Sequence, residues 1–285
     1  MLQIMRDKCV VSVIIPARNE ESHIRACIRS VHKQTYAHVE TVVVDNASTD
    51  ATKAIAKKLG ARVYDKGPER SAQRNFGVSK ATGTYFVFID ADMELTPKVI
   101  EECVEAMQKS QKGTAPYQAM VIPEKSKGKN FLAKCKALER TYYEGVEWIE
   151  AARFYKRSAF IRLGGYDETL TGPEDFDLPQ KLKASYGHAA IGRISAYIIH
   201  NEDNISLWAL LKKKYYYGKR MYAYSRKTEN RFISLRQANL FSRLSLFFSD
   251  SDRLFKQPAI GVGMLVMKIM ETTALFLGYI RGRFA

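Results

Sequence analysis

The chain has 285 residues, of which 46% are hydrophobic and 26% are charged. This balance argues against an intrinsically disordered chain, and the length fits one large domain or one domain with an appendage. The formal net charge of +15 predicts anionic partners: a phosphorylated ligand, an acidic membrane surface or a nucleic acid. The four cysteines include no CxxC pair, so neither a zinc site nor a disulfide framework is expected. The N-terminal apolar residues lead straight into a strand-like run without a small-residue cleavage site, so no signal peptide is expected.

The first hundred residues alternate between β-branched apolar runs and segments with helical spacing. Strands are predicted at residues 10–15, 39–45, 61–64 and 86–89, and helices at residues 24–31, 48–59 and 69–80, with a further helix opening at 96–97. The first strand is expected to stop at Pro16, because proline lacks the N–H of a ladder bond. Strands that alternate with helices predict an α/β fold, a mostly parallel sheet with helices on both faces.

Three of the predicted strands end in polar clusters. These clusters are Ala-Arg-Asn-Glu at 17–20, Asp-Asn-Ala-Ser at 45–48 and Asp-Ala-Asp at 90–92. Ligands of open α/β sheets bind at the carboxyl ends of the strands, so we expect a site where these clusters converge. No GxGxxG follows the first strand and no GxxxxGK[ST] occurs, which argues against a dinucleotide site or a P-loop.

Asp90 and Asp92 follow the apolar run of the fourth strand. If that strand continues, the two carboxylates lie on one face and repel each other unless a cation lies near them. A hard divalent cation such as Mg²⁺ or Mn²⁺ favours oxygen ligands and often shares them with phosphates. The alternative is a solvated strand end with an Asp-capped turn. These residues alone leave both interpretations open.

The sequence changes character from about residue 205. Residues 207–227 are dense in basic and aromatic side chains, residues 240–248 carry one apolar helical face, and residues 258–280 form a long apolar stretch. We therefore expect a separate C-terminal module at 206–285, basic, amphipathic and helical.

The apolar stretch at 258–280 is long enough to cross a bilayer, which takes about 20 residues. Lys268 and Glu271 near its middle are unfavourable in a bilayer, although their spacing allows them to pair with each other. We therefore expect helices that lie in or dip into the membrane interface, with the basic residues of 207–227 on anionic headgroups. The alternative is a helical cap packed on the first domain.

Four segments in this order resemble the family-2 glycosyltransferases with a GT-A fold: VSVIIPARNEE, VVVDNASTDAT, RSAQRNFGVSKATGTYFVFIDADMELTP and GGYDETLTGPEDFDLPQKL. The resemblance covers residues 10–200 and implies a catalytic domain at 1–205. It implies inverting transfer of a sugar from a UDP- or GDP-linked donor to an acceptor. Processive members of the family carry a QxxRW motif, which is absent here, so one sugar per encounter is expected.

The resemblance makes Asp92 the main ligand of a divalent metal, Mn²⁺ or Mg²⁺, which neutralises the diphosphate leaving group without proton transfer. It offers His200 as a further metal ligand, the alternative being a structural histidine. The other donor-site residues that it implies hold the base, the ribose or the diphosphate: Pro16, Ala17, Asn19, Glu20, Asp45, Arg70, Arg74, Asp90 and Ala91.

Within this set, the resemblance distinguishes several roles. Asp45 would accept a hydrogen bond from a base N–H, and Asp90 would hold the ribose or the metal shell. Arg70 and Arg74 would contact the base or the diphosphate. The alternative for the two arginines is a solvated helix face.

Glu174 and Asp175 lie where a helix is expected to start, and the helix dipole favours negative charge there. Alone, this pattern indicates an ordinary acidic first turn. The resemblance instead implies a general base in this pair, which takes the proton of the acceptor hydroxyl as it attacks the anomeric carbon. We assign that role to Asp175, with Asp177 as the fallback, and expect Glu174 to position the acceptor.

The membrane interpretation predicts a lipid-linked acceptor, a polyprenyl phosphate or a lipid-bound glycan, used at the cytoplasmic face of the membrane. No nucleic acid is expected, because the basic residues cluster beside apolar helices. Two alternatives stay open: a nucleotide-sugar-binding protein with weak catalysis, and a sugar-1-phosphate nucleotidyltransferase. The second would usually begin with a glycine-rich loop, whereas PARNE follows the first strand here.

Overall fold

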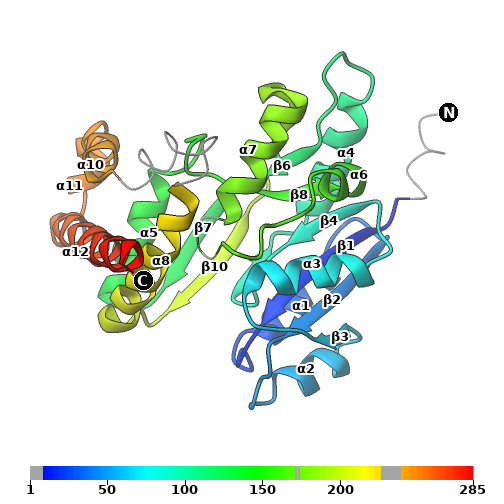
Figure 1. The fold of residues 1–285 in the computed structure, drawn as a ribbon, viewed down its shortest axis with the longest axis horizontal. Coiled ribbons are helices and arrows are strands. Elements are labelled where there is room, and N and C mark those ends of the chain that lie inside the picture. Colours follow the sequence, from blue (N-terminus) through cyan, green and yellow to red (C-terminus); the bar gives the residue numbers. More distant parts are fainter. Residues whose placement is uncertain (1–8, 171, 173, 226–238, 285) are drawn as a thin grey trace. The chain divides into compact units, whose positions relative to one another are not determined.

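A computed structural model describes residues 9–170, 172, 174–225 and 239–284 (Figure 1). Its internal contacts divide the chain into two compact units. The first, here called the sheet unit, comprises Met1–Pro123, Ala151–Glu168 and Asp175–His200. The second, here called the helix unit, comprises Glu124–Glu150, Thr169–Glu174 and Asn201–Ala285.

A seven-stranded sheet forms the centre of the sheet unit. Its strands are β1 (Val11–Ala17), β2 (Val39–Asp45), β3 (Arg62–Asp65), β4 (Tyr85–Phe88), β6 (Ala119–Val121), β8 (Ala152–Lys156) and β9 (Ile191–Arg193), in the order β3-β2-β1-β4-β8-β6-β9. The strands from β3 to β4 are parallel to one another, whereas β8 runs antiparallel to both β4 and β6. The sheet is therefore mixed and mostly parallel, as the alternation of strands and helices predicts.

Helices pack on both faces of this sheet. They are α1 (Ile24–His32), α2 (Thr52–Lys58), α3 (Arg70–Lys80), α4 (Val99–Ser110), α6 (Arg157–Arg162) and α7 (Glu174–Tyr186), with a 3₁₀ helix at His188–Ala190. Successive side chains of a strand point to opposite faces. Val13 and Ile15 accordingly join residues of α1 and α4 in one core cluster, while Ile14 joins residues of α3, α6 and α7 in another.

The first strand was predicted to stop at Pro16. It continues instead to Ala17. Its pairing with β2 includes Pro16 opposite Val44. Its pairing with β4 ends earlier, at Ile14 opposite Phe88. The N–H that proline lacks would face the side where β4 has already ended, so its absence removes no ladder hydrogen bond.

The fourth strand ends before the two aspartates. Strand β4 stops at Phe88, Ala91 and Asp92 form a turn, and the N–H of Met93 donates to the carbonyl of Asp90 (3.0 Å). The expectation that Asp90 and Asp92 share one strand face is therefore wrong. A short strand that was not predicted, β5 (Met93–Leu95), follows the turn and pairs antiparallel with β10 (Ile198–Asp203).

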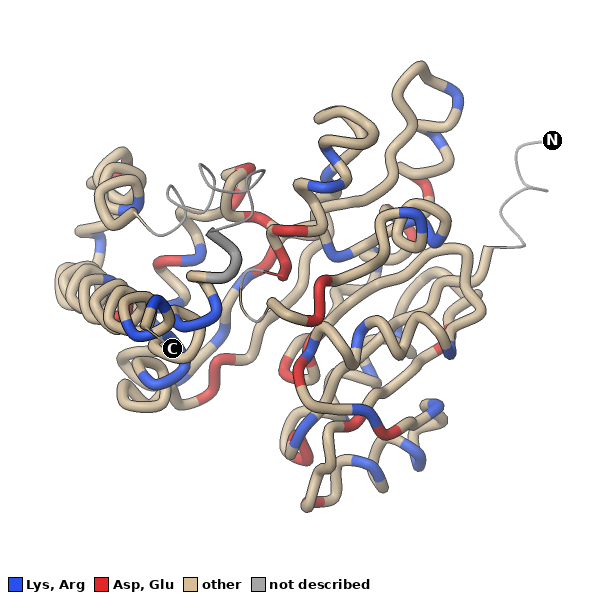
Figure 2. Tube along the Cα trace, viewed as in Figure 1, with Lys and Arg blue, Asp and Glu red and all other residues tan. Residues whose placement is uncertain are grey.

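The helix unit contains α5 (Phe131–Thr141), α8 (Leu207–Ser225), α10 (Leu240–Phe248), α11 (Ser251–Phe255) and α12 (Pro258–Arg283), with β7 (Glu124–Gly128) paired to the end of β10. Lysines and arginines follow one another along α8 (Figure 2). The predicted basic segment ends at residue 227, and residues 226 and 227 lie outside the described part of the chain. This unit is larger than the predicted module at 206–285, because it also takes in Glu124–Glu150.

Buried ion pairs explain why α5 belongs with the C-terminal helices. Within α12, the Nζ of Lys268 lies 2.6 Å from Oε2 of Glu271, which confirms the pairing expected from their spacing. From α5, Glu139 contacts Lys268, and the Nζ of Lys136 lies 3.0 Å from Oε1 of Glu271. Glu139, Glu271 and Lys268 are only 0%, 2% and 7% exposed, so these charges satisfy one another inside the unit.

Candidate functional site

The loops that follow β1 and β2 are bonded to each other at the carboxyl edge of the sheet. The amide of Asn19 donates to Oγ of Ser48 (2.8 Å), and its side-chain Oδ1 accepts from the amide of Thr49 (2.9 Å). The amide of Glu20 donates to Oγ1 of Thr52 (2.7 Å). Asn19 has a positive φ of 53°, which asparagine tolerates better than most residues. The two predicted ligand-binding clusters therefore form one connected rim.

Gln73 of α3 ties the same two strands together and was not predicted as part of the site. Its Nε2 donates to the carbonyls of Val44 (2.6 Å) and Ala17 (3.2 Å). The neighbouring Pro16 and Ala17 are buried in β1. A polar residue on the buried face of an amphipathic helix is the sequence signal that would have pointed to Gln73.

The carboxylate of Asp45 is fully buried at the end of β2. Its Oδ2 accepts from the amide of Ser48 (2.8 Å) and its Oδ1 from the hydroxyl of the same residue (2.5 Å). Asp45 thus organises its own loop. The predicted contact with a base N–H stays a prediction.

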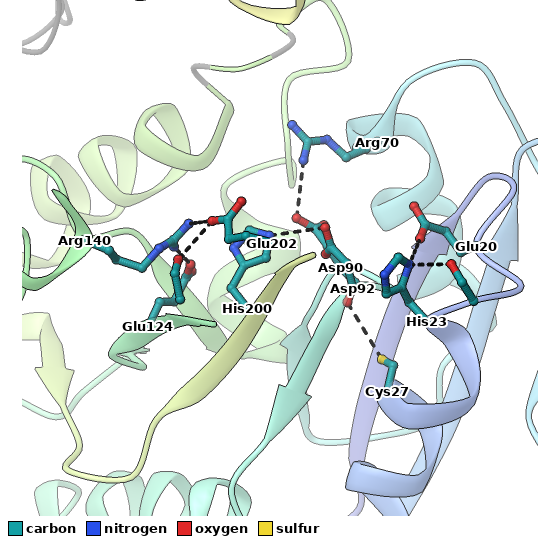
Figure 3. Close-up of polar contacts among 12 residues, drawn as sticks. Glu20, His23, Cys27, Arg70, Asp90, Asp92, Glu124, Arg140, His200 and Glu202 are labelled. Carbon is teal, nitrogen blue, oxygen red and sulfur yellow. Dashed lines mark hydrogen bonds and ion pairs between the residues drawn. The ribbon is translucent and has the colours of Figure 1, made fainter. Parts of the chain in front are cut away.

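Asp90 lies between two arginines of α3. Its Oδ2 is 3.3 Å from Nη1 of Arg70, and its Oδ1 is 2.9 Å from Nη2 of Arg74 (Figure 3 shows the Arg70 contact). Burial alone would raise the pKa of Asp90, but the positive charges of Arg74, Arg70 and the buried Arg153 outweigh it and hold this pKa well below its usual range. Asp90 is therefore a stable carboxylate whose charge is already offset by its neighbours.

Arg74 also reaches the acidic pair on α7. Its Nη1 lies 2.6 Å from Oδ1 of Asp175, which is 101 positions away in the sequence. The ring of Tyr166 faces the guanidinium, 5.2 Å from its central carbon to the ring centroid. One side chain thus links the predicted donor-side carboxylate of Asp90 to the predicted acceptor-side carboxylate of Asp175.

Asp92 points away from these arginines, toward His200 of β10. The Nε2 of His200 lies 3.2 Å from Oδ2 of Asp92 (Figure 3). Oδ1 of Asp92 is buried and receives no hydrogen bond from any residue that the structure describes. An oxygen anion without a donor, beside an imidazole nitrogen, fits a divalent cation such as Mn²⁺. Asp92 and His200 would hold such a metal.

Glu20 adds negative charge to the same region. Its Oε2 lies 3.2 Å from Nδ1 of His23, a histidine that was given no role from the sequence (Figure 3). Burial, and after it the charge of Asp92, raises the pKa of Glu20. Across the described residues no cluster of three or more His, Cys, Asp or Glu side chains has metal-binding geometry. Further ligands for a metal at Asp92 would come from a phosphate group or water.

The acidic pair begins α7, as predicted. Glu174 is 1% exposed, and Asp177 is also 1% exposed with its Oδ2 2.8 Å from Nζ of Lys181. The side chain of Asp175 keeps 22% exposure. A general base must reach its substrate, so among these three carboxylates accessibility favours Asp175 over the fallback Asp177.

Comparison with known proteins gives a family. The sequence profile described as Glycosyl transferase family 2 matches residues 12–164, which is more than half of the chain. A 4,4'-diaponeurosporenoate glycosyltransferase from Staphylococcus haemolyticus is 33% identical over 126 residues, 40% of this chain and 33% of that relative. The chain covers less than a third of the length of three further curated relatives.

Two solved structures show the fold. The mannosyltransferase PcManGT from Pyrobaculum calidifontis, in complex with GDP-Man and Mn²⁺, gives a TM-score of 0.62 at 16% identity, over 97% of this chain and 88% of that one. Glucosyl-3-phosphoglycerate synthase from Mycobacterium tuberculosis, in complex with Mn²⁺, UDP and glucosyl-3-phosphoglycerate, gives 0.53 at 20% identity, over 78% and 82%. The expected GT-A fold is confirmed.

Proposed function

Because this chain belongs to glycosyl transferase family 2, we propose that it transfers one sugar from a UDP- or GDP-linked donor to the hydroxyl or phosphate of an acceptor, with inversion. The observation that carries this proposal is the arrangement of three aspartates. Asp92 lies beside His200, and Asp90 is joined to Asp175 through a single arginine. A metal-binding carboxylate, a second donor-side carboxylate and an accessible base are thereby gathered in one unit.

The donor would lie along the rim built from residues 17–20 and 45–48. Its diphosphate carries the charge that must be neutralised when the anomeric C–O bond breaks; Asp92 and His200 would hold a divalent metal, which would supply this neutralisation. Arg70, whose side chain is 30% exposed, adds a positive charge near the same carboxylates. Both structural neighbours contain Mn²⁺, one with UDP and the other with GDP-Man. This supports a metal here and leaves open whether the donor carries uridine or guanosine.

The acceptor would approach Asp175. In an inverting displacement, the acceptor oxygen attacks the anomeric carbon from the side opposite the leaving diphosphate. The carboxylate of Asp175 takes the hydroxyl proton as the new bond forms, and the nucleoside diphosphate leaves with the bonding electrons. Nothing in this step needs a covalent sugar–enzyme intermediate.

We also propose that the acceptor is lipid-linked and that the enzyme works at the cytoplasmic face of a membrane. Helix α12 has 26 residues and a mean hydropathy of 1.6 in its most apolar window, of which 28% is buried. Large apolar side chains at helical spacing are exposed along it: Val262, Val266, Ile269, Phe276, Leu277 and Ile280. A cap packed on a globular domain would bury such a stripe and expose its charges. Here the charged side chains of Lys268 and Glu271 are buried together with Met264 and Met267, while the larger apolar stripe is exposed.

The charge of the C-terminal segment supports an anionic surface as the partner. Residues 206–285 contain 15 lysines and arginines against four aspartates and glutamates. Helix α8 exposes several of them: Lys212, Lys213, Lys219 and Arg220. An apolar stripe beside basic side chains is the pattern of a helix pair that lies in the interface of an anionic bilayer.

The first experiment is a calorimetric titration of UDP and of GDP, with and without Mn²⁺, on the wild type and on Asp92→Asn. We expect one nucleotide to bind in a metal-dependent way, with an affinity reduced about tenfold or more in Asp92→Asn. Asp65→Asn is the control, because Asp65 ends the edge strand β3 with an exposed side chain. Well-folded protein that binds neither nucleotide under any metal condition would contradict the donor-site assignment.

A second measurement separates the remaining alternatives. With a nucleotide-sugar and lipid-linked acceptors, a glycosyltransferase releases a nucleoside diphosphate, whereas a sugar-1-phosphate nucleotidyltransferase consumes or releases pyrophosphate. A protein that only binds nucleotide-sugars releases neither. Loss of turnover in Asp175→Asn with unchanged nucleotide affinity is the result expected for the proposed base.

A further inference from the structure

We propose that Arg74 is a positioning residue. It holds the carboxylate of Asp175 at a fixed place relative to Asp90 and contacts neither the donor nor the acceptor. This inference rests on the proposed function, in which Asp175 is the base. It differs from the expectation that Arg74 binds the nucleobase or the diphosphate of the donor.

The terminal nitrogens of Arg74 are committed to two different carboxylates. Nη1 lies 2.6 Å from Oδ1 of Asp175, and Nη2 lies 2.9 Å from Oδ1 of Asp90. The guanidinium is rigid and planar, so the angle between its two nitrogens fixes the separation and orientation of the two carboxylates. A lysine carries the same charge but cannot impose this geometry.

Arg74 is more deeply buried than the two carboxylates that it contacts. The side chain of Arg74 is 0% exposed, whereas Asp90 and Asp175 keep 17% and 22% exposure. A bound substrate can therefore reach the carboxylates but not the guanidinium behind them. For Arg74 to bind a diphosphate it would have to leave two charge-assisted hydrogen bonds, each about twice as strong as a neutral one.

The backbone that carries Arg74 is held in place. A Cβ at Gly77 would lie 2.5 Å from Cγ2 of Ile14, so α3 packs against β1 more closely than a larger residue would allow. Asn75 binds the segment that carries Tyr166: its Nδ2 donates to the carbonyl of Tyr166 (2.8 Å), and its Oδ1 accepts from the amide of Tyr166 (3.0 Å). The helix that carries Arg74 is thus held against β1, and the guanidinium lies over the ring of Tyr166, whose backbone Asn75 holds in place.

Arg70 is the natural comparison. It lies one turn earlier on α3, is 30% exposed and approaches Asp90 at 3.3 Å. Its exposure leaves it accessible to a phosphate group. The sequence predicts the same role for the two arginines, whereas the structure distinguishes them. Arg70 is suited to binding the donor, and Arg74 is suited to aligning the general base Asp175.

The test compares Arg74→Lys with Arg70→Lys in the full chain, by donor KM and kcat and by calorimetric nucleotide affinity. We expect Arg74→Lys to lower kcat about 10- to 100-fold, because small displacements of a catalytic group have effects of this size, while donor KM and nucleotide affinity change less than about threefold. Arg70→Lys should mainly weaken donor binding. Asp175→Asn should lower kcat far less in the Arg74→Lys background than in the wild type.

Several results would overturn the inference. Arg74→Lys with unchanged kcat and tenfold weaker nucleotide binding makes Arg74 a donor ligand. If Arg74→Lys lowers the melting temperature, the nucleotide affinity and kcat together, and Asp175→Asn lowers kcat as much in this background as in the wild type, the role of Arg74 is merely structural. If Arg74→Lys does not fold, Asp175→Glu, which moves the carboxylate by one methylene, must lower kcat with affinity intact; full activity of this variant refutes the inference. Failure of the proposed function itself is visible separately, as absent nucleotide binding by the wild type.

Discussion

The Nε2 of His200 lies 3.2 Å from Oδ2 of Asp92, although 108 positions separate the two residues. The antiparallel pairing of β5 with β10 brings them together, since His200 lies opposite Met93, the residue that follows Asp92. The imidazole approaches one oxygen of the carboxylate, and the other oxygen is buried without a donor among the residues described. This geometry fits a metal-binding role for His200, which stays a prediction beside the structural alternative until a substitution distinguishes the two.

We predict that His200→Gln raises the Mn²⁺ concentration needed for half-maximal nucleotide binding by about tenfold, because the metal loses a nitrogen ligand. Saturating Mn²⁺ should restore most of the binding. The measurement is calorimetric titration at several Mn²⁺ concentrations. His32→Gln, at an exposed position of α1, serves as the control. A lower melting temperature with an unchanged Mn²⁺ dependence would make His200 a structural residue.

Much of the sheet unit could be predicted because its signals are local. Short continuous apolar runs rich in β-branched or aromatic residues mark β1, β2 and β4, and the polar clusters after them mark the ligand edge. A turn after the fourth strand was one of the two interpretations that the sequence left open, but strand β5 could not be predicted, since its three residues are too few to show a period. Its pairing with β10 depends on tertiary contacts between positions about a hundred residues apart.

The helix unit shows the same limit. The pairing of Lys268 with Glu271 follows from their spacing on one helix, and it was expected. The addition of Lys136 and Glu139 could not be expected, because Lys136 meets Glu271 across 135 positions. An amphipathic pattern indicates that a helix has a buried side, but not which distant helix it packs against.

We predict that Glu139→Gln destabilises the protein by about 3–5 kcal/mol, the usual effect of removing one partner from a buried ion pair. The carboxylate of Glu139 is fully buried and accepts from Lys136, Lys268 and the hydroxyl of Tyr143. Its loss leaves the ammonium groups of the buried Lys268 and the half-buried Lys136 short of negative charge. Denaturant unfolding measures the effect. Glu144→Gln, at an exposed position near the end of α5, should change stability by less than about 1 kcal/mol.

The same carboxylate predicts an acid-sensitive helix unit. Burial alone would raise the pKa of Glu139, but Lys136 and Lys268 outweigh it and hold this pKa well below its usual value of 4.5. The unfolded chain then binds the proton more tightly than the folded one, so the stabilisation is complete above pH 4.5 and is lost as the pH falls below it.

Melting temperatures recorded between pH 7 and pH 3 test this pH dependence. We expect the wild type to lose stability below pH 4.5, and Glu139→Gln to show a flatter curve over the same range. Identical slopes for the two proteins would mean that other carboxylates cause the acid loss.

The exposed stripe of α12 makes the membrane proposal testable. We predict that Val266→Gln combined with Phe276→Gln lowers partitioning onto phosphatidylcholine–phosphatidylglycerol vesicles at least tenfold, because each side chain contributes about 1 kcal/mol or more when it leaves water. The two are 51% and 59% exposed, so the fold should tolerate the changes. Co-sedimentation measures binding, and Ile161→Gln, 55% exposed on α6 of the sheet unit, controls for a general loss of hydrophobicity. Undiminished binding of the α12 variant would move the lipid contact to another surface.

The exposed lysines of α8 allow a separate test of the anionic surface. We predict that Lys212→Gln combined with Lys213→Gln weakens binding to vesicles that contain phosphatidylglycerol but not to neutral vesicles. The loss should be smaller at high salt, because salt screens the charges.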